Sequence, residues 1–412
     1  MNVEYFISKR LINTKKNKNV FSRPIVRITI SAIALSVAVM IISLSTLFGF
    51  KKEITDQIIN INSHIEITSN KYDSLSEYRS PILATRELKK SILKNKEVLD
   101  VREVVYEYGL IKTSDEFLGV RVKGIVSSEW KKLEENILSG KIIDSENSIL
   151  ISSSISKKLR LGLGDSIYVY FPSSKERLEK TKMPNVKHLK ICGIYKTSMS
   201  EFDTKLVFAN IDKLRKIKSW DDADVELLEV GLKDLKNLSK VRDQLSVSID
   251  GFFNKNVDSI KDLYPEIFDW LDLQDINVRI IIILMILVCV MNIISSILIL
   301  VLERTRLIGI LKSIGCLNWS IRKIFIYNAM YFVFRGLLWG NLIAFFLLLI
   351  QYNFNILKLD EEMYYMDTIA VSFNLLPIIV LNLGVALVCF LMMIIPSIII
   401  TKISVVKAVR FN

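Results

Sequence analysis

Long apolar runs without charge divide the chain. Residues 28–50, 280–302 and 375–400 contain no Asp, Glu, Lys or Arg, and residues 324–350 contain one such residue, Arg335. A helix of about 20 apolar residues crosses the roughly 30 Å hydrocarbon layer of a bilayer. The first run is longer than the apolar part of a cleaved secretory signal, so we expect it to remain as an anchor. The pattern therefore predicts four transmembrane helices, at residues 25–50, 278–302, 324–350 and 369–400.

A mixed pattern fills residues 51–277, between the first two predicted spans. "HIEIT" at 64–68 and "SIYVYF" at 166–171 alternate between apolar and polar residues in the manner of β-strands. "ATRELKKSILKN" at 84–95 and "LKNLSKVRDQL" at 235–245 carry helical spacing. The sequence therefore predicts a large α+β domain inserted between transmembrane helices 1 and 2.

One glycine-rich stretch has some features of a phosphate loop. "LRLGLGDSIYVY" at 159–170 contains a GxG element but lacks both the GxxxxGK[ST] spacing and a third glycine. Gly164 and Asp165 come directly before an alternating run, which is typical of a turn that enters a strand. We therefore predict a turn here and no nucleotide site.

Positive charge is unevenly placed around the predicted spans. Residues 1–27 hold seven Lys or Arg, the 303–323 loop holds five and the 401–412 tail holds three, whereas the 351–368 loop has four acidic residues and one Lys. Because cytoplasmic segments are enriched in Lys and Arg, both termini and the 303–323 loop are predicted to be cytoplasmic. The 51–277 domain then lies outside. The chain has a net charge of +12, and many of its basic residues flank the predicted spans, where they can contact anionic lipids. We therefore expect no nucleic-acid partner.

The N-terminal segment, 1–24, begins with an amphipathic pattern. In "VEYFISKRLI" the apolar residues Val3, Phe6, Ile7 and Leu11 fall near one helical face, with basic residues beside it. This pattern is typical of a short helix that lies on the inner membrane surface. A plain cytoplasmic N-terminus remains the alternative interpretation.

The third predicted span carries small and charged residues. Gly336 and Gly340 lie four residues apart on one helical face, which permits close approach of a neighbouring helix. Arg335 either reaches toward the membrane interface or contributes to helix packing.

Motifs for catalysis or metal binding are missing from the sequence. His64 and His188 have no partners at metal-ligand spacing, and both are expected on the surface. The four cysteines form no CxxC pair, and the GxSxG, HExxH and nucleotide-loop patterns do not occur. We therefore expect no catalytic residue, no metal and no cofactor bound by this chain. The protein is predicted to move or hold other molecules rather than to react with them.

The stretch "ERTRLIGILKSIGC" at 303–316 predicts a short amphipathic helix after the second span. Leu307, Ile310, Leu311 and Ile314 fall on one face, and Gly315 suits the left-handed position that ends a helix. Asn318 is a candidate cap for the next helix. Such a helix can rest at the membrane surface or fit a groove on a cytoplasmic partner.

This stretch strongly resembles the coupling element of the FtsX-like permease family, the membrane subunits of type VII ABC transporters. "SILISSSISKKLRLGLGDSIYVYF" is similar to the family's MacB-like periplasmic core, and the order of one span, a large domain and three spans agrees over the whole chain. Within the family, the transmembrane subunits of lipoprotein-releasing systems are most similar. They share "LKICGIYKTSMSEFDTKLVFANID" at 189–212, residues 268–315, and "IPSIIITKISVVKAVRF" at 395–411. The tail departs from them with Val where Pro is frequent, and Arg335 stands where relatives often have Gln.

The resemblance implies a function. Such complexes extract lipoproteins from the inner membrane of a Gram-negative bacterium and pass them to a periplasmic carrier by mechanical transmission. The expected partners are an ABC ATPase, which binds ATP and Mg, and a second permease subunit, either a copy of this chain or a paralogue. A lipoprotein substrate and the periplasmic carrier complete the set.

The resemblance also implies three groups of site residues. The expected ATPase-coupling residues are Glu303, Arg304, Arg306, Gly309, Lys312 and Gly315. Segment 172–187 corresponds to a carrier-binding hook, or else is a plain solvated loop, and its candidate residues are Pro172, Lys175, Arg177, Lys180, Lys182 and Pro184. The candidate residues for a lipid cavity are Met40, Leu44, Phe48, Met285 and Asn292.

Two alternatives remain at this point. One is another member of the same superfamily, either a MacB-like efflux subunit or an FtsX-like regulator of cell-wall hydrolases. The other is a membrane-anchored receptor or scaffold that has no ATPase partner. Co-purification of an ATPase would favour the transporter interpretation over this second alternative.

Overall fold

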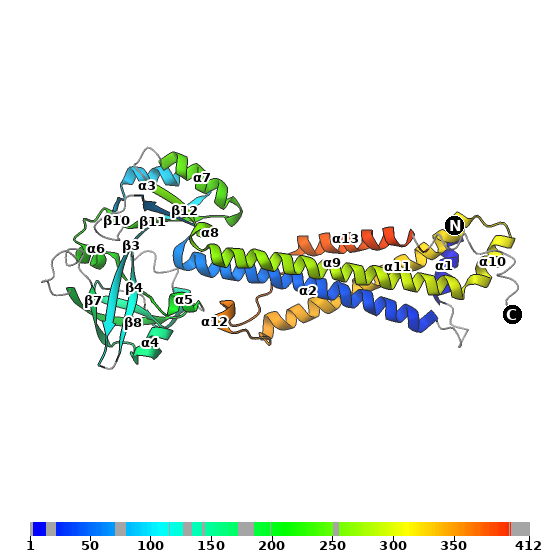
Figure 1. The fold of residues 1–412 in the computed structure, drawn as a ribbon, viewed down its shortest axis with the longest axis horizontal. Helices are drawn as coiled ribbons and strands as arrows, with labels where there is room; N and C mark the ends of the chain where they lie inside the picture. The colour runs from blue at the N-terminus through cyan, green and yellow to red at the C-terminus, as the bar shows by residue number, and fades with distance from the viewer. Residues whose placement is uncertain are drawn as a thin grey trace. The chain divides into compact units, whose positions relative to one another are not determined.

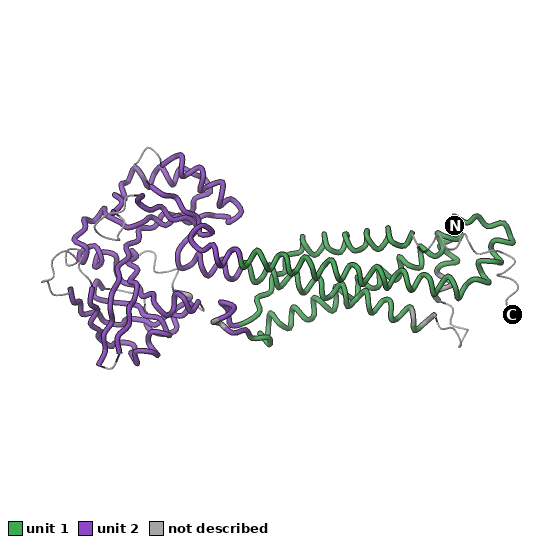
Figure 2. Tube along the Cα trace, viewed as in Figure 1, with its two compact units in different colours: residues 1–51, 270–358, 368–412 green, residues 52–269, 359–367 purple. Residues whose placement is uncertain are grey.

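The computed structural model describes most of the chain. The described residues are 3–13, 22–70, 80–114, 116–126, 134–141, 145–171, 185–197, 199–249, 255–394 and 396. They fall into two compact units (Figure 2): residues 1–51, 270–358 and 368–412 form the first, and residues 52–269 and 359–367 form the second.

The first unit is helical (Figure 1). Four of its helices are long and apolar enough to cross a membrane, and α2 and α9 each continue into the second unit. The helices are α1 Val3–Asn13, α2 Ser22–Asn62, α9 Pro265–Glu303, α10 Thr305–Ser313, α11 Asn318–Phe354 and α13 Leu375–Met392.

The long helices differ in length from the predicted spans. The first span was expected to end at residue 50, whereas α2 continues to Asn62. The charges after Phe50 lower the hydropathy but leave helical spacing intact, because Ile54, Ile58 and Ile61 are buried at positions i, i+4 and i+7. Helix α9 likewise begins at Pro265 rather than at residue 278, and α13 begins at Leu375 rather than at residue 369, while residues 395 and 397–400 of the expected span lie outside the described residues.

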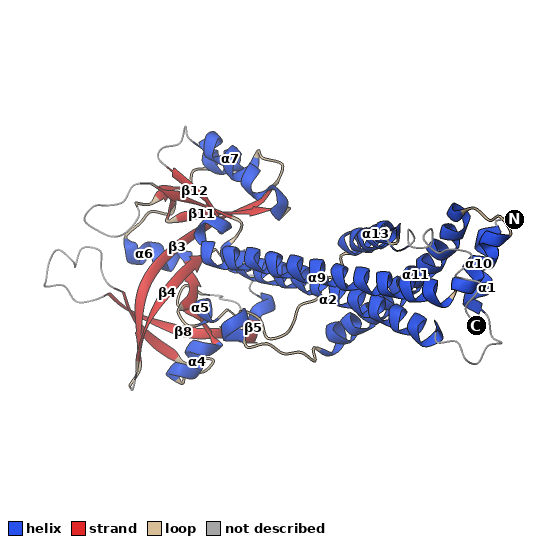
Figure 3. Ribbon diagram, turned by 45° about the vertical axis from the view of Figure 1, so that its right-hand side comes forward, coloured by secondary structure: helices blue, strands red, loops and turns tan. Residues whose placement is uncertain are grey.

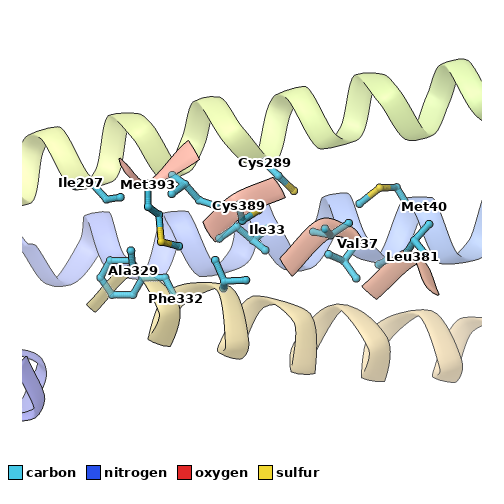
Figure 4. Close-up of a cluster of buried hydrophobic side chains, with 14 of the residues drawn as sticks. Ile33, Val37, Met40, Cys289, Ile297, Ala329, Phe332, Leu381, Cys389 and Met393 are labelled. Atoms are coloured by element: carbon cyan, nitrogen blue, oxygen red, sulfur yellow. The ribbon is translucent and has the colours of Figure 1, made fainter. Parts of the chain in front are cut away.

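The helical unit has a continuous apolar core (Figure 4). Ile33 and Val37 of α2, Cys289 of α9, Phe332 of α11 and Cys389 of α13 are among its buried members. Because lipid chains are as apolar as Leu, such helices associate through close packing and hydrogen bonds rather than through exclusion of water.

Close packing between α2 and α11 depends on two glycines. A Cβ atom added at Gly336 would lie 2.4 Å from Ile33 Cγ2, and one at Gly340 would lie 2.8 Å from the carbonyl oxygen of Ala34. The predicted close helix approach on the Gly336–Gly340 face is therefore confirmed. Arg335, on the other hand, is exposed, and its guanidinium lies 5.3 Å from the ring centre of Tyr331.

The second unit contains the strands, which lie between α2 and α9 in chain order (Figure 3). The strands are β1 Ile65–Ser69, β2 Ile82–Leu83, β3 Val98–Lys112, β4 Phe117–Ile125, β5 Ile137–Gly140, β6 Ser148–Ser152, β7 Ser166–Phe171, β8 Asn185–Tyr195, β9 Leu206–Asn210, β10 Asp224–Val225, β11 Leu227–Leu232 and β12 Lys255–Ser259. The helices are α3 Arg86–Leu93, α4 Ser153–Leu159, α5 Ser200–Asp203, α6 Ile211–Lys218, α7 Leu238–Ile249, α8 Ile260–Leu263 and α12 Glu361–Tyr364, with short 3₁₀ turns at Glu134–Asn136 and Leu235–Asn237.

Pairing in the main sheet follows the order β12-β1-β11-β3-β4-β9-β6-β8-β5, and β7 pairs with both β3 and β8. Strands β3, β4, β9, β6, β8 and β7 therefore form a closed ring, around a core that includes Val122, Ile151, Val169 and Val207. Closure leaves these strands without a free edge. Helix α3 packs on β3 and helix α7 on β12.

The predicted α+β character of this unit is confirmed. "HIEIT" overlaps β1 and "SIYVYF" is β7, while the first predicted helical stretch contains α3 and the second overlaps α7. Gly164, two residues before β7, has φ +89°, and the carboxylate of Asp165 accepts a hydrogen bond of 2.7 Å from the amide of Gly162. The Gly-Asp stretch is therefore a turn, as predicted.

Substitution of the packed glycine tests this arrangement. We expect Gly336→Leu to lower the free energy of unfolding of the helical unit by about 1–3 kcal/mol, because the added side chain displaces α2. Gly384→Leu in α13 is the matched control, since a Cβ there meets no atom within 4 Å. Thermal unfolding of the detergent-solubilised protein measures both variants. Equal melting temperatures for the two would contradict the proposed packing.

Candidate functional site

The 303–323 loop folds as a separate short helix after a break. Helix α9 ends at Glu303, and Arg304 occupies the N-cap position of α10 with a non-helical φ of −102°. At the far end Gly315 has φ +89°, as predicted for a left-handed residue. The amides of Gly315 and Cys316 donate to the carbonyl oxygens of Lys312 and Leu311, at 3.0 and 2.9 Å. This pair of backbone hydrogen bonds is a Schellman motif, which ends α10.

The start of the following helix differs from the prediction. Helix α11 takes Leu317 as its N-cap residue, without a side-chain hydrogen bond, and Asn318 is its first helical residue. The predicted cap by Asn318 is therefore wrong by one position. An apolar N-cap provides no side-chain acceptor for the first helical amides, so these depend on other partners.

One side of α10 is fixed to the transmembrane core. Ile308 is fully buried and belongs to the apolar cluster shared with α2, α9, α11 and α13, and Gly309 beside it is also buried. Leu311 and Cys316 pack against the same cluster. This side of α10 therefore belongs to the close-packed core of the helical unit.

The opposite side of the loop exposes apolar side chains. Ile310 is 45% exposed, Ile314 77%, Leu317 74% and Trp319 59%. Two of these, Ile310 and Ile314, belong to the apolar face predicted from the sequence, while Leu307 and Leu311 are half-buried. We call Ile310, Ile314, Leu317 and Trp319 the loop surface. Large exposed apolar side chains gathered in one short segment are typical of protein or membrane contact sites.

Charged residues lie in the same segment as the loop surface. Glu303 and Arg306 are exposed, Arg304 and Lys312 are half-exposed, and the ammonium of Lys323 lies 6.0 Å from the ring centre of Trp319. The six predicted coupling residues therefore lie at the end of α9, along α10 and directly after it. The sequence analysis did not predict Leu317 and Trp319 as part of this site, although two large apolar residues in a polar loop could have indicated them.

Helix α1 packs beside this region. The hydroxyl of Ser8 donates to Asn328 Oδ1 of α11 at 2.9 Å, and both residues are buried. The rings of Tyr5 and Tyr327 meet edge to face, with centroids 6.0 Å apart. The predicted amphipathic helix is therefore present, but its buried contact runs through Ser8, which lies outside the apolar face expected to anchor it.

The five candidate cavity residues do not share one environment. Met40 is fully buried in the apolar core, and Leu44 and Met285 pack against that core. Phe48 is 36% exposed, and the amide of Asn292 donates to the carbonyl oxygen of Val288 in its own helix at 3.0 Å. Of this group, Phe48 is the residue whose side chain is most available to a lipid.

The sequence analysis did not predict hydrogen-bonded pairs of polar side chains between the helices of this unit. The hydroxyls of Thr29 and Ser296 are hydrogen-bonded between α2 and α9. The side-chain amides of Asn341 and Asn382 exchange hydrogen bonds of 2.7 and 3.0 Å between α11 and α13. Polar residues in apolar helices rarely lack partners, so their presence in the spans was the available signal.

The candidate hook residues, Pro172 to Pro184, lie outside the described residues. The described ends on either side, Phe171 of β7 and Asn185 of β8, are register partners in an antiparallel pair. The tail 401–412 also lies outside the described part of the chain.

The two histidines have different surroundings. His64 is half-buried and its Nδ1 accepts a hydrogen bond of 3.2 Å from the amide of Leu232, so the expected surface position is wrong for it. His188 is exposed and lies 5.1 Å from the ring of Tyr168. Among the described residues, no group of three or more His, Cys, Asp or Glu side chains is placed to hold a metal ion.

Comparison with known proteins gives matches over nearly the whole chain. Residues 28–247 match the model of the MacB-like periplasmic core domain, and residues 279–405 match that of the FtsX-like permease C-terminal region. The lipoprotein-releasing system transmembrane protein LolC of Neisseria meningitidis is 27% identical over 82% of this chain and 80% of its own length. The LolE protein of the same system in Haemophilus influenzae is 24% identical over 85% and 83%. The periplasmic region of MacB from Actinobacillus actinomycetemcomitans covers 49% of this chain and 91% of its own, with a TM-score of 0.35 and 10% identity.

Truncation of Ile308 tests which side of α10 is packed. We expect Ile308→Ala to lower the free energy of unfolding by about 2–5 kcal/mol, because it leaves a cavity in the core. Ile314→Ala, at a site that is 77% exposed, should leave stability unchanged. Thermal unfolding of the purified protein compares them. A larger loss for Ile314→Ala would mean that α10 packs through its other face.

Proposed function

Because the chain belongs to the FtsX-like permease family and carries a MacB-like periplasmic core domain, we propose that it is the transmembrane subunit of an ATP-driven lipoprotein-releasing complex. The complex extracts lipoproteins from the inner membrane and passes them to a periplasmic carrier. Relatives named as lipoprotein-releasing system transmembrane proteins support this substrate class. Both chain ends and the 303–323 loop then lie in the cytoplasm.

The release of a lipoprotein requires an energy source. Each CH₂ group of an acyl chain gains about 0.8 kcal/mol in the bilayer, so two or three chains hold the protein too tightly for spontaneous release. The sequence has no Walker-type nucleotide loop. The work is therefore assigned to a separate ATPase subunit, which binds ATP and Mg and hydrolyses ATP in the cytoplasm.

The loop surface is the single observation that carries this proposal. Ile314 and Trp319 expose apolar side chains, the ammonium of Lys323 lies 6.0 Å from the ring centre of Trp319, and Ile308 holds α10 against the transmembrane core. Exposed apolar anchors within a charged rim are typical of a protein interface. In this proposal the ATPase binds the loop surface, and Glu303, Arg304, Arg306 and Lys312 give directional contacts.

The long helices support a mechanical transmission. Helix α9 has 39 residues and ends at Glu303, directly before α10. At about 1.5 Å per residue it is roughly 58 Å long, nearly twice the hydrocarbon thickness. One continuous helix thus connects the ATPase-binding loop to the folded periplasmic domain. In this proposal a displacement that reaches the end of α9 at Glu303 is carried along an uninterrupted helix to Pro265.

The membrane faces leave room for a second subunit and for lipid. Ile283, Leu284, Leu287 and Met291 of α9 are exposed apolar side chains. We assign them to contacts with lipid, acyl chains or the second permease subunit, which is either another copy or a paralogue. Phe48 is the first candidate for contact with an acyl chain. The 172–187 segment is the candidate for contact with the carrier.

Loss of the ATPase from a purified complex tests the proposal. We expect Ile314→Asp to lower recovery of an ABC ATPase about tenfold in a mild-detergent pull-down, because a charge at an interface anchor costs 1.4 kcal/mol or more. Ile356→Asp is the matched control, since Ile356 is also exposed, at 62%, but belongs to the acidic 351–368 loop. Mass spectrometry of the retained proteins gives the readout.

The same eluate separates the alternatives. A periplasmic lipoprotein carrier among the retained proteins supports lipoprotein release. An ATPase accompanied by an efflux component or a cell-wall hydrolase would favour the other members of the superfamily. If the wild-type protein retains no ATPase in any mild detergent, the receptor or scaffold interpretation replaces the transporter.

A further inference from the structure

The end of α2 lies against a buried charge in the second unit. The carbonyl groups of the last helical turn have no partners within a helix, and they carry its negative dipole end. Here the carbonyl oxygen of Ile61 accepts a hydrogen bond of 2.5 Å from the ammonium of Lys123 in β4. Lys123 is 1% exposed. A buried lysine at this position both caps the helix and neutralises its dipole.

A carboxylate holds the same lysine in place. The ammonium of Lys123 lies 2.5 Å from Glu229 of β11, whose side chain is 1% exposed. The guanidinium of Arg102 in β3 approaches the other oxygen of Glu229 at 3.6 Å. Strand β3 separates β4 from β11 in the sheet, so this ion pair crosses three neighbouring strands. The cap on α2 is therefore anchored in the middle of the sheet.

The start of α9 is tied to the same end of α2. Tyr264 directly precedes Pro265, the first residue of α9, and its hydroxyl accepts a hydrogen bond of 2.7 Å from the side-chain amide of Asn62. The ring of Tyr264 meets that of Phe202 in α5 edge to face, with centroids 5.9 Å apart. Burial raises the pKa of the Tyr264 hydroxyl well above its usual value, so the group stays neutral in this position.

The chain between α2 and the sheet is too short to bend freely. Helix α2 ends at Asn62 and β1 begins at Ile65, so Ser63 and His64 alone separate them. Ser63 is buried, with φ +100°, and its amide donates to the carbonyl oxygen of Ile59 at 2.8 Å. The helices are also tied within the first unit, where Lys51 pairs with Asp272 and Asp275 at 3.1 and 2.6 Å.

We propose that Lys123 and Tyr264 form a rigid joint that fixes the end of α2 and the start of α9 to the periplasmic sheet, so that helix movement displaces this domain instead of bending the connection. The inference rests on the proposed function, because it assigns these two side chains the role of positioning residues in ATP-driven release. Neither residue touches the lipoprotein in this role. They determine how much of the helix displacement reaches the domain that does.

The test compares two charge-removing double variants in the reconstituted complex. Lys123→Met with Glu229→Gln removes the lysine together with its carboxylate partner, so that neither of these two charges is left without the other if the single variant fails to fold, and Arg102 keeps Asp100 at 3.7 Å. Lys218→Met with Glu226→Gln is the matched control, since this pair lies 3.0 Å apart with side chains 8% and 18% exposed. We expect the lipoprotein released per ATP hydrolysed to fall about fivefold or more in the first variant and to stay unchanged in the control. Tyr264→Phe, which keeps the ring, should lower the same ratio by a smaller factor.

A second readout separates the joint from the proposed function. Amide hydrogen exchange at Ile61–His64 should accelerate in the Lys123 and Glu229 double variant but not in the control. An unchanged release ratio, or unchanged exchange at these amides, overturns the joint. If the wild-type complex releases no lipoprotein while exchange still accelerates in the variant, the proposed function fails and the rigid connection itself stands.

Discussion

The unbroken hydrogen bonding of α2 is the constraint on which the rest of the structure depends. A helix in hydrocarbon must satisfy its backbone groups internally, and this one continues for 41 residues until Asn62. One stretch of α2 lies in the packed core, where Ile33 and Val37 contact Gly336 and Gly340. In its last turn the carbonyl oxygen of Ile61 accepts a hydrogen bond from Lys123. One continuous helix thus contributes residues to both compact units.

Neighbouring helices hold α2 in place through packing and polar contacts. Within the helical unit, α2 is held by close packing and by the hydrogen bond between Thr29 and Ser296. Helix α9 runs beside it (Figure 1), paired through Lys51 with Asp272 and Asp275 and through contact of the rings of Phe50 and Trp270. Helix α9 ends at Glu303, directly before α10, so the proposed ATPase-binding segment continues from a helix that is packed in this bundle.

Much of this arrangement is readable from the sequence where the cause is local. The apolar runs, the left-handed Gly315 and the close-packing face of Gly336 and Gly340 depend on neighbouring residues in one helix or turn. Lys123 could not be identified in this way, because a lysine in an alternating strand normally faces water. Its burial depends on Glu229, 106 residues further along the chain, and on the carbonyl of Ile61. Ile308 and Ser8 were missed for the same reason, since their partners lie on other helices.

Reconstitution of the complex in proteoliposomes with an acylated lipoprotein tests the central claim most directly. The measured quantity is the lipoprotein that moves from the vesicles to a soluble periplasmic carrier. With ATP we expect release to track hydrolysis, because the energy of two or three buried acyl chains must be supplied by the ATPase. A non-hydrolysable ATP analogue should not sustain turnover. Continued ATP hydrolysis by the complete complex, with the lipoprotein still in the vesicles, would contradict the account.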